Sequence, residues 1–403
     1  MARERPLPGF PGHRGRRETM NGGRDGAVPH IHLVSSEFPP LVRGGAGIHV
    51  YELHRHLSRV TDVSVTLLRG SPREQSTSIP LPAPARSQRY RVHRTLADSF
   101  AQETFGQVVH THSMAAHIAA MRSGRPYLST VHSIEADRPW RAARHGDLFE
   151  RAVDTEMAAL NAASTVICVS EAIARDLAKH YGIERSHVVP PAYEVAQWYH
   201  DDACDALPQR VLPWDRPFVL ATGRISKQKG YRYLFAALRR LRRPTTLVAR
   251  AGSPESDADA AEFRAWLAKV PERHTVVWLE SGLGRRGMRQ LYSKAALHVS
   301  PAIYEPFGLS NVESLLCGTP VCATAVGGTP QALGDTPAIL LPDPADGALE
   351  FGDRLAEVLE TAPYDPELRE QTRAPSTRHF LAEGDWERVL PRMLQIYQEA
   401  VHG

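Results

Sequence analysis

The segment FVLATGRISKQKGYRYLFAAL, from Phe218 to Leu238, contains a short apolar run, a polar turn with several cations, and then a run with helical periodicity. A short buried strand that leads through a turn into a helix is the repeating unit of α/β proteins. The same order recurs before this segment, at VSVTLL and STVICVS, and after it, at TTLVARAG and ALHVSPA. This alternation predicts parallel α/β sheets throughout the chain.

The chain has 403 residues, which is more than one hydrophobic core usually serves, so we expect two domains. Between Val189 and Pro217 the pattern is broken by scattered prolines and shows no sustained period, as is typical of a domain boundary. We predict an N-terminal α/β domain over 29–195, a linker over 196–216, a second α/β domain over 217–380, and a C-terminal helix over 381–403.

Composition narrows the class of protein further. Residues 1–28 are rich in Arg, Gly and Pro and lack apolar periodicity, which predicts a disordered tail. The formal charge of +3 is small for this length and argues against a nucleic-acid partner. The four cysteines have no CxxC spacing and no long apolar run occurs, so we expect a cytoplasmic, metal-free protein without a membrane span. The sequence leaves open whether it is a monomer or a homodimer.

A glycine-rich loop lies near the start of the first domain, in EFPPLVRGGAGIHVYEL, from Glu37 to Leu53. Glycine lets the backbone approach an anion closely, and the N-terminus of the following helix offers free N–H groups. The spacing matches neither GxGxxG nor GxxxxGKS, so neither a dinucleotide site nor a P-loop is indicated. On these residues alone, a plain tight turn explains the loop as well as a phosphate site does.

Arg224 and Lys229 follow the strand in the segment quoted first, and two cations at that point could meet a diphosphate. Each cation about 4 Å from a phosphate charge would gain roughly 4 kcal/mol at an effective dielectric near 20, before desolvation is counted. His112 and His132 stand at the apparent ends of two strands, where a histidine can hydrogen-bond to sugar hydroxyls or phosphate. A solvated loop and ordinary buried histidines are the simpler alternatives.

Glu305 and Glu313 lie eight residues apart in YEPFGLSNVESLL, a segment otherwise apolar enough to be core. Buried carboxylates are costly unless they are paired or hydrogen-bonded, so each needs a protein partner or a ligand. Glu313 follows Ser310 with the spacing of a capping box, which would make it a structural residue. Glu305 has no such capping motif. Because it stands beside the N–H groups of Phe307 and Gly308, it is placed to bind sugar hydroxyls.

These motifs, in this order, resemble the family 4 glycosyltransferases, which are retaining enzymes with two Rossmann-like domains facing a cleft (the GT-B fold). The resemblance covers about residues 30–400. Glu305 to Glu313 matches the E-x7-E motif of the family, and GRISKQKG matches its G-R-x4-K-G phosphate-binding pattern. EFPPLVRGGAGIHVYEL and TVHSIEADRPW look most like the actinobacterial glycogen synthase and maltose-1-phosphate synthase branch.

The resemblance implies a role for each matching residue. Arg224 and Lys229 would hold the donor diphosphate, Glu305 the hydroxyls of the transferred sugar, and Glu313 the ribose. The implied donor-binding set is Gly45, Arg224, Lys229, Glu305, Phe307, Gly308, Leu309 and Glu313; the implied catalytic set is His132, Arg224, Lys229 and Glu305; the implied acceptor-binding residues are His112 and Glu135. The donor would be a UDP-, ADP- or GDP-sugar, the acceptor a hydroxyl compound, and no metal or other cofactor would be needed. The last helix would cross back to the N-terminal domain.

Three departures from the family pattern affect the expected acceptor. VVPPAYE, from Val188 to Glu194, replaces the usual VPNG, Gln331 stands where Glu is frequent, and the segment from Arg69 to Gln107 is short. We therefore expect a pocket unlike that of a polymer-extending enzyme, with a small aminocyclitol-type alcohol as acceptor. The alternatives are a glycogen or maltose-1-phosphate synthase-like glucosyltransferase and a noncatalytic nucleotide-sugar-binding protein.

Overall fold

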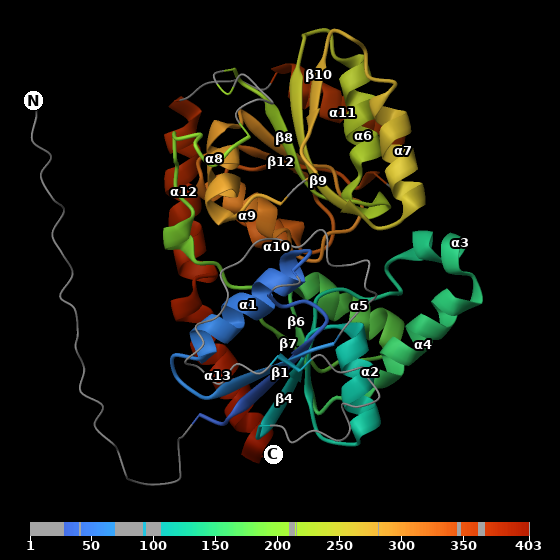
Figure 1. The fold of residues 1–403 in the computed structure, drawn as a ribbon, viewed down its shortest axis with the longest axis vertical. Helices are drawn as coiled ribbons and strands as arrows, with labels where there is room; N and C mark the ends of the chain where they lie inside the picture. Colours follow the sequence, from blue (N-terminus) through green and yellow to red (C-terminus); the bar gives the residue numbers. More distant parts are fainter. Residues whose placement is uncertain are drawn as a thin grey trace, which may run out of the picture.

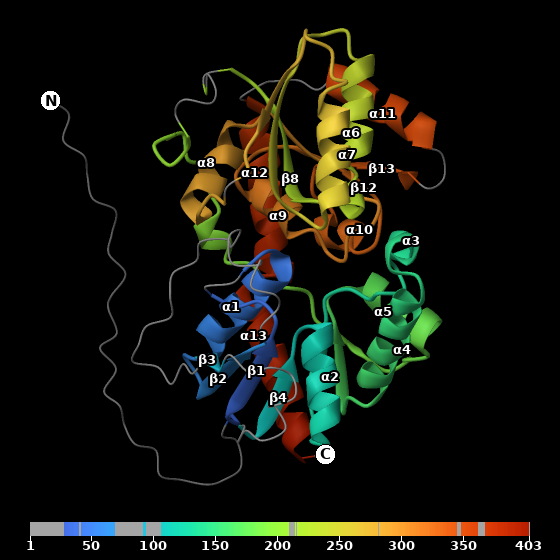
Figure 2. The same ribbon diagram turned by 45° about the vertical axis from the view of Figure 1, so that its right-hand side comes forward.

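A computed structural model describes residues 28–39, 42–68, 92–93, 106–208, 214, 216–280, 282–344, 348–361 and 367–402. The chain forms two parallel β-sheets, each covered by helices, and the two α/β domains lie one above the other (Figures 1 and 2). The predicted fold class is confirmed. Except for Val28, the predicted tail lies outside the described residues, as does most of the segment from Arg69 to Gln107.

The first domain has a seven-stranded parallel sheet in the order β3-β2-β1-β4-β5-β6-β7. Its strands are β1 (Ile31–Ser35), β2 (Val63–Leu67), β3 (Val92–His93), β4 (Val108–Thr111), β5 (Leu128–Val131), β6 (Thr165–Cys168) and β7 (His187–Val188). Its helices are α1 (Gly45–Leu57), α2 (Met114–Ser123), α3 (Ala142–His145), α4 (Asp147–Asn161) and α5 (Glu171–Tyr181). The strand order reverses between β1 and β4, where the register pairs Ile31 with Val108.

The second domain has a six-stranded parallel sheet in the order β10-β9-β8-β11-β12-β13. Its strands are β8 (Val219–Ile225), β9 (Thr246–Pro254), β10 (Thr275–Trp278), β11 (Leu297–Ser300), β12 (Val321–Thr324) and β13 (Ile339–Leu341). Its helices are α6 (Tyr231–Arg240), α7 (Asp257–Leu267), α8 (Arg285–Lys294), α9 (Leu309–Leu316), α10 (Thr329–Leu333), α11 (Ala348–Thr361) and α12 (Glu367–Glu383). The strand order reverses here between β8 and β11.

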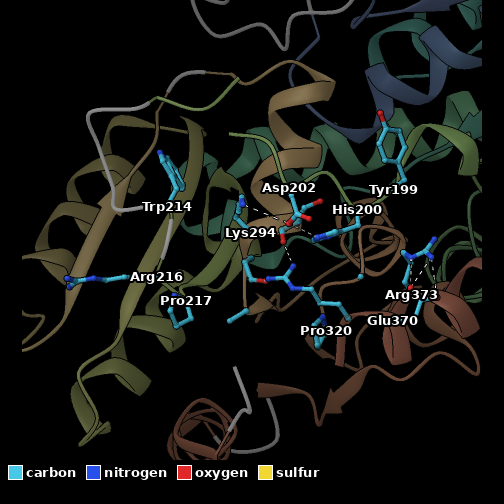
Figure 3. A pocket seen from close by; sticks show the side chains of 15 residues that line it. Tyr199, His200, Asp202, Trp214, Arg216, Pro217, Lys294, Pro320, Glu370 and Arg373 are labelled. Carbon is cyan, nitrogen blue, oxygen red and sulfur yellow. Dashed lines mark hydrogen bonds and ion pairs between the residues drawn. The ribbon is translucent and has the colours of Figure 1, made fainter. Parts of the chain in front are cut away.

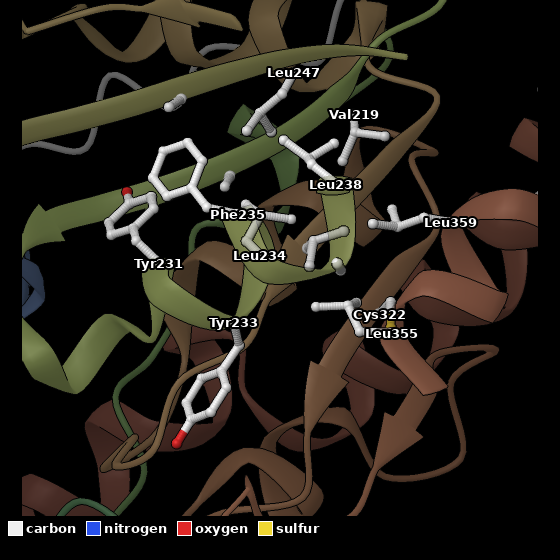
Figure 4. Packing of buried hydrophobic residues seen from close by; sticks show 14 of the residues in the cluster. Val219, Tyr231, Tyr233, Leu234, Phe235, Leu238, Leu247, Cys322, Leu355 and Leu359 are labelled. Carbon is white, nitrogen blue, oxygen red and sulfur yellow. The ribbon is translucent and has the colours of Figure 1, made fainter. Parts of the chain in front are cut away.

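The core of the second domain forms where α6 and α11 cover β8 and β9 (Figure 4). Leu234 and Leu238 lie four residues apart on α6, so one face of the helix meets both Val219 of β8 and Leu355 of α11 in a single buried cluster. Truncating one such leucine to alanine typically costs about 2–5 kcal/mol. This packing fixes α6, and with it the turn between β8 and α6 that carries the predicted phosphate-binding cations.

The last helix, α13 (Trp386–His402), leaves the second domain and runs along the sheet of the first (Figures 1 and 2). Trp386, Met393 and Tyr397 are buried in the same cluster as the strands of the first domain, and the Tyr397 hydroxyl lies 2.8 Å from Nδ1 of His110 on β4. No helix in the described ranges is long and apolar enough to cross a membrane.

The two segments that connect the domains, one after β7 and one before α13, are hydrogen-bonded to each other. The backbone N–H of Tyr193, after the last strand of the first domain, donates to the carbonyl oxygen of Gly384, just before α13, at 2.8 Å. A Cβ on Gly384 would lie 2.0 Å from Cε2 of Tyr193, so only glycine allows this approach. The two segments that connect the domains therefore lie side by side, where a hinge between the domains is expected.

Candidate active site

A cavity of about 350 Å³ lies between the two domains, where the C-terminal ends of both sheets face each other. Doubly wound sheets bind ligands at the point where their strand order reverses, and loops after β1, β8 and β11 contribute to the lining. The sequence-predicted residues that line it are Gly45, His132, Arg224, Lys229, Glu305, Phe307, Gly308, Leu309 and Glu313. The structure thus brings together side chains that the sequence separates by up to 268 positions, from Gly45 to Glu313.

The glycine-rich loop is folded around the carboxylate of Glu37. Oε2 of Glu37 accepts hydrogen bonds from the backbone N–H groups of Arg43 and Gly44, at 2.8 and 3.1 Å. Helix α1 begins at Gly45, where an added Cβ would lie 3.5 Å from Cδ1 of Leu309 in the other domain. The loop therefore lies directly across the cleft from the start of α9. The sequence analysis missed this role of Glu37, because only the folded loop brings the carboxylate back onto backbone amides six and seven residues later.

The end of β8 and the turn that follows it each require a glycine. Gly223 has φ +140°, and the aliphatic stem of Lys229 passes 3.1–3.2 Å from where its Cβ would lie. Gly230 has φ +64°, and a Cβ there would lie 1.7 Å from the carbonyl oxygen of Pro301, after β11. These contacts explain why the motif has glycine before its arginine and after its lysine: the first lets the lysine cross the strand end, and the second packs the turn against the β11 loop.

Glu305 is buried, at 7% exposure, and has a partner within the protein. Its Oε2 lies 2.7 Å from Nζ of Lys229, in a hydrogen-bonded ion pair. Its carbonyl oxygen accepts from the N–H of Gly328 at 2.8 Å, and a Cβ on Gly327 would lie 2.3 Å from that same oxygen. Backbone and side chain of Glu305 are thus both held in place at the cavity wall.

Two arginines on neighbouring strands supply positive charge that is not paired directly. Within the described part of the chain, the guanidinium group of Arg224 has no hydrogen bond or ion pair; burial lowers its pKa, and the more distant carboxylates of Glu37 and Glu255 oppose this. Burial also lowers the pKa of Arg250, whose buried Nε finds no partner among the described residues. Arg250 pairs in register with Thr222 and lines the same cavity. Arg250 was not among the predicted site residues, although an arginine near the end of a buried strand was a signal for it.

Glu313 does not close a capping box. Helix α9 begins at Leu309 after Gly308, which has φ +101° and no side-chain cap, and the carboxylate of Glu313 instead accepts a hydrogen bond from the Tyr292 hydroxyl at 3.1 Å. Burial raises the pKa of Glu313 to about 7. The capping-box alternative was wrong because the positive-φ glycine, and not Ser310, turns the chain into the helix. The first N–H groups of α9 are left without a side-chain cap beside the cavity.

His132 directly follows β5 and lines the cavity. Its Nε2 lies 3.3 Å from Nδ1 of His112, and burial holds the pKa of His132 well below its usual range, so the imidazole is neutral near pH 7. The two residues expected at the acceptor do not line this cavity. His112 is buried behind His132, and Glu135 accepts hydrogen bonds from Arg138 and Arg141, at 3.0 and 2.7 Å. Glu135 is therefore already neutralised by its own loop.

Two polar contacts connect the first domain to the second. Arg285 of α8 pairs with Glu52 of α1 across the domains. The carbonyl oxygen of the Gln331 side chain accepts from the backbone N–H of Glu171 at 2.8 Å. Gln331, one of the departures from the family pattern, thus joins α10 to the start of α5.

The unusual segment after β7 also reaches the cavity. Tyr193 stacks on Phe307, with ring centroids 6.0 Å apart and an interplanar angle of 27°, and meets Phe380 edge-on. Glu194 accepts from Arg55 at 2.8 Å, and its side chain stands on the cavity wall. VVPPAYE therefore places an aromatic ring and a carboxylate beside the predicted donor loop.

A second cavity, of about 820 Å³, lies away from the cleft, between the linker, the end of α8 and α12 (Figure 3). None of the predicted site residues lines it. Lys294 lies 3.9 Å from Asp202, Arg373 lies 2.9 Å from Glu370, and Arg369 donates to backbone carbonyls. Because the motif residues lie in the cleft and none of them lines this second cavity, we place the ligand site in the cleft between the domains.

Two parallel α/β domains that enclose a cleft at their switch points, lined by cations and carboxylates from both sides, define a GT-B glycosyltransferase. Residues 43–197 match the family described as Glycosyltransferase Family 4, and residues 206–375 match Glycosyl transferases group 1. The chain is 30% identical to the alpha-maltose-1-phosphate synthase of Mycolicibacterium smegmatis, over 92% of this chain and 99% of that protein. The chain therefore belongs to the family 4 glycosyltransferases, as the sequence motifs predicted.

Other relatives agree with this assignment. A D-inositol 3-phosphate glycosyltransferase of Xylanimonas cellulosilytica is 30% identical, over 75% of this chain and 74% of that protein. Among solved structures, sucrose-phosphate synthase from Thermosynechococcus elongatus superimposes with a TM-score of 0.72 at 23% identity, over 92% and 98% of the two chains. Anabaena HepE, solved with UDP and glucose, gives 0.69 at 16% identity, over 92% and 100%. The two structural matches bear on the fold alone.

Proposed function

We propose that this glycosyltransferase moves a hexosyl group from a UDP-, ADP- or GDP-sugar to a hydroxyl of a small polar acceptor, with retention of anomeric configuration. The observation that carries the proposal is the juxtaposition of Lys229 and Glu305 at 2.7 Å, next to Arg224, at the strand ends facing the cleft. A cation for the diphosphate and a carboxylate for the sugar have to be neighbours in the site, because the phosphate is attached to the sugar directly.

In this proposal Arg224, Lys229 and Arg250 neutralise the diphosphate. Glu305 accepts hydrogen bonds from the hydroxyls of the transferred sugar, and Glu313, whose carboxylate is held by Tyr292, accepts from the ribose. Gly45, Phe307, Gly308 and Leu309 are the remaining donor contacts, where backbone N–H groups face the ligand.

The chemistry follows from where charge develops. As the bond between the anomeric carbon and the diphosphate oxygen breaks, negative charge grows on the leaving oxygen, where the fixed cations stabilise it. The acceptor oxygen bonds to the anomeric carbon on the same face, and the acceptor proton passes to the departing phosphate. His132 is neutral, so it serves as a hydrogen-bonding partner to the sugar near the reacting carbon. The scheme needs neither a metal nor an organic cofactor.

We propose a small aminocyclitol-type alcohol as the acceptor. The part of the cavity wall that belongs to the first domain carries the carboxylates of Glu37, Glu52 and Glu194 and the guanidinium groups of Arg43 and Arg138. Glu52 and Glu194 are paired with Arg285 and Arg55, so an ammonium group of the acceptor would bind here by replacing an arginine at one of these carboxylates.

A maltose-1-phosphate synthase-like transfer to a sugar phosphate is the second candidate. The 30% identity to that enzyme over 99% of its length supports it. A cytoplasmic location and a homodimer stay predictions, as does retention itself.

The test is a matrix of donors and acceptors. UDP-, ADP-, GDP- and TDP-glucose and the corresponding N-acetylglucosamine donors are each incubated with a diaminocyclitol, glucose 1-phosphate or glycogen, and products are identified by mass spectrometry. We expect product on the diaminocyclitol, with an α-linkage by proton NMR when the donor is an α-sugar. Product only on glucose 1-phosphate selects the second candidate. Tight donor binding by calorimetry without turnover on any acceptor would indicate a noncatalytic binding protein.

A further inference from the structure

We propose that His49, His112 and His132 form a binding site for a divalent transition metal such as Zn²⁺, and that occupation of this site inhibits the enzyme. The three histidines come from different elements: His49 from α1, His112 from the end of β4, and His132 from the end of β5. One ring nitrogen of each lies within 4.8 Å of the others. The folded sheet therefore gathers them at one point on the floor of the cleft.

The spacing is close to what a metal needs. Zinc binds histidine nitrogens at about 2.0–2.1 Å in tetrahedral geometry, which places two ligating nitrogens about 3.4 Å apart. Nδ1 of His112 and Nε2 of His132 are 3.3 Å apart. Only the third nitrogen, that of His49, has to approach, and side-chain rotation of the helix residue can supply that movement.

The protonation state is also right. A metal binds neutral imidazole, and burial lowers the pKa of His49 to about 4 and holds the pKa of His112 and His132 well below the usual range. In the hydrogen bond between Nδ1 of His112 and Nε2 of His132 one nitrogen carries the proton, so on metal binding that proton has to move to the other nitrogen of its ring.

Two of the ring nitrogens lack the partner that a buried polar atom normally has. Nδ1 of His49 and Nε2 of His112 make no hydrogen bond to any described residue, and the two side chains are buried at 7% and 2% exposure. Other histidines nearby are satisfied: His110 bonds to Tyr397 and Thr130, and His117 bonds to Thr111. Buried unpaired groups are rare and need an explanation, and a bound ion would supply a partner for Nδ1 of His49. Nε2 of His112 is the other nitrogen of that ring and would carry its proton when Nδ1 binds the ion.

The fourth coordination position opens on the cleft. His49 and His132 both line the cavity, so a water molecule or a sugar hydroxyl can complete the tetrahedron. A metal bound there would be coordinated by His132 and would occupy the position of the reacting sugar. The inhibition rests on the function proposed above for His132, whereas the binding of metal does not.

Cobalt provides a direct readout on the full-length protein, independent of activity. EDTA-treated and desalted protein is titrated with CoCl₂, and the visible absorption of four-coordinate Co²⁺ is recorded. We expect one Co²⁺ per chain, displaced by Zn²⁺, with at least tenfold weaker binding in His112→Gln and in His49→Gln. His117→Gln, an equally buried neighbour outside the triad, should bind as the wild type does. No absorption in the wild type, or equal binding in the three variants, would overturn the site.

Zinc inhibition is measured on whichever donor and acceptor pair proves active. Zn²⁺ at saturation should lower the wild-type rate at least tenfold, with recovery on adding EDTA, and His112→Gln should need at least tenfold more Zn²⁺ for the same fractional loss from its own metal-free rate. Metal binding without inhibition would refute the inhibitory role while leaving the site in place. Absence of any transfer activity would bear on the proposed function only, because the cobalt spectrum does not depend on it.

Discussion

The ammonium group of Lys229 lies 2.7 Å from Oε2 of Glu305, so two residues expected to contact different parts of the donor are bound to each other. The pair holds both side chains at the cavity wall before the donor arrives. A donor diphosphate would then compete with Glu305 for the lysine, and the sugar hydroxyls would compensate the carboxylate. Arg224 and Arg250, which form no ion pair within the described ranges, supply the positive charge that this exchange requires.

Replacing either Arg224 or Lys229 with alanine should lower kcat by about 10²-fold or more, as for the loss of one donor that stabilises transition-state charge. Lys227→Ala is the matched control, because Lys227 lies on the same turn but does not line the cavity. Steady-state kinetics at saturating acceptor measures the effect. Wild-type kinetics in both cavity variants would show that these cations do not act on the leaving group.

The Lys229–Glu305 pair should be energetically coupled in the absence of ligand. Glu305→Ala leaves a partly buried ammonium without its partner, whereas the double variant removes both charges. We expect the double variant to lose less stability than the sum of the two single variants, with a coupling of about 0.5–3 kcal/mol. Urea unfolding of the four proteins gives the cycle, and strict additivity would mean that the pair contributes nothing before the donor binds.

Glu313 should make stability depend on pH. Its pKa is raised from 4.5 to about 7, so the folded protein holds this proton more tightly than the unfolded chain does. Its favourable contribution is complete below about pH 4.5 and is lost as pH rises through about 7. Glu313→Gln removes this loss, so the Tm difference between variant and wild type should grow by a few degrees from pH 5 to pH 8.

The same variant should bind the donor about tenfold more weakly or worse, because a hydrogen bond to a charged group contributes about 1.5–3 kcal/mol. Thermal scans at the two pH values and donor titration by calorimetry measure both effects. A Tm difference that does not change with pH would mean that Glu313 is ionised in the folded protein as easily as in water.

Gly230→Ala should be far more damaging than Gly182→Ala. Both glycines have left-handed φ, +64° and +68°, but a Cβ at Gly230 would lie 1.7 Å from the carbonyl oxygen of Pro301, whereas one at Gly182 would meet nothing within 4 Å. The strain common to both is about 1–2 kcal/mol. Urea unfolding should give at least twice that loss for Gly230→Ala, and equal losses would place the turn elsewhere than on the β11 loop.

The fold was accessible from the sequence because each βα unit carries its own local pattern: an apolar run, a turn and an amphipathic helix, as at Val219, Gly223 and Leu234. The cations at the end of β8 were accessible for the same reason. Where the strand order of a sheet reverses, residues far apart in the sequence meet. No local sequence pattern indicates which of their side chains will face each other.

The features of the site that local sequence patterns do not reveal depend on such distant contacts. Glu37 acquires its role when the loop folds back onto it, and Arg250 when β9 lies beside β8. His112, expected at the acceptor, lies behind His132, because the cluster forms only once β4 and β5 pair. Ser310 and Glu313 have the spacing of a capping box, but the chain enters α9 through a glycine with positive φ.

The most direct test of the central claim is a crystal structure of the protein with a nondegraded analogue of its nucleoside diphosphate sugar. We predict phosphate oxygens within hydrogen-bonding distance of Arg224 and Lys229, hydroxyls of the sugar on Glu305, and ribose hydroxyls on Glu313. A diphosphate bound elsewhere, for example against Arg369 in the second cavity, with the Lys229–Glu305 pair unchanged, would contradict it.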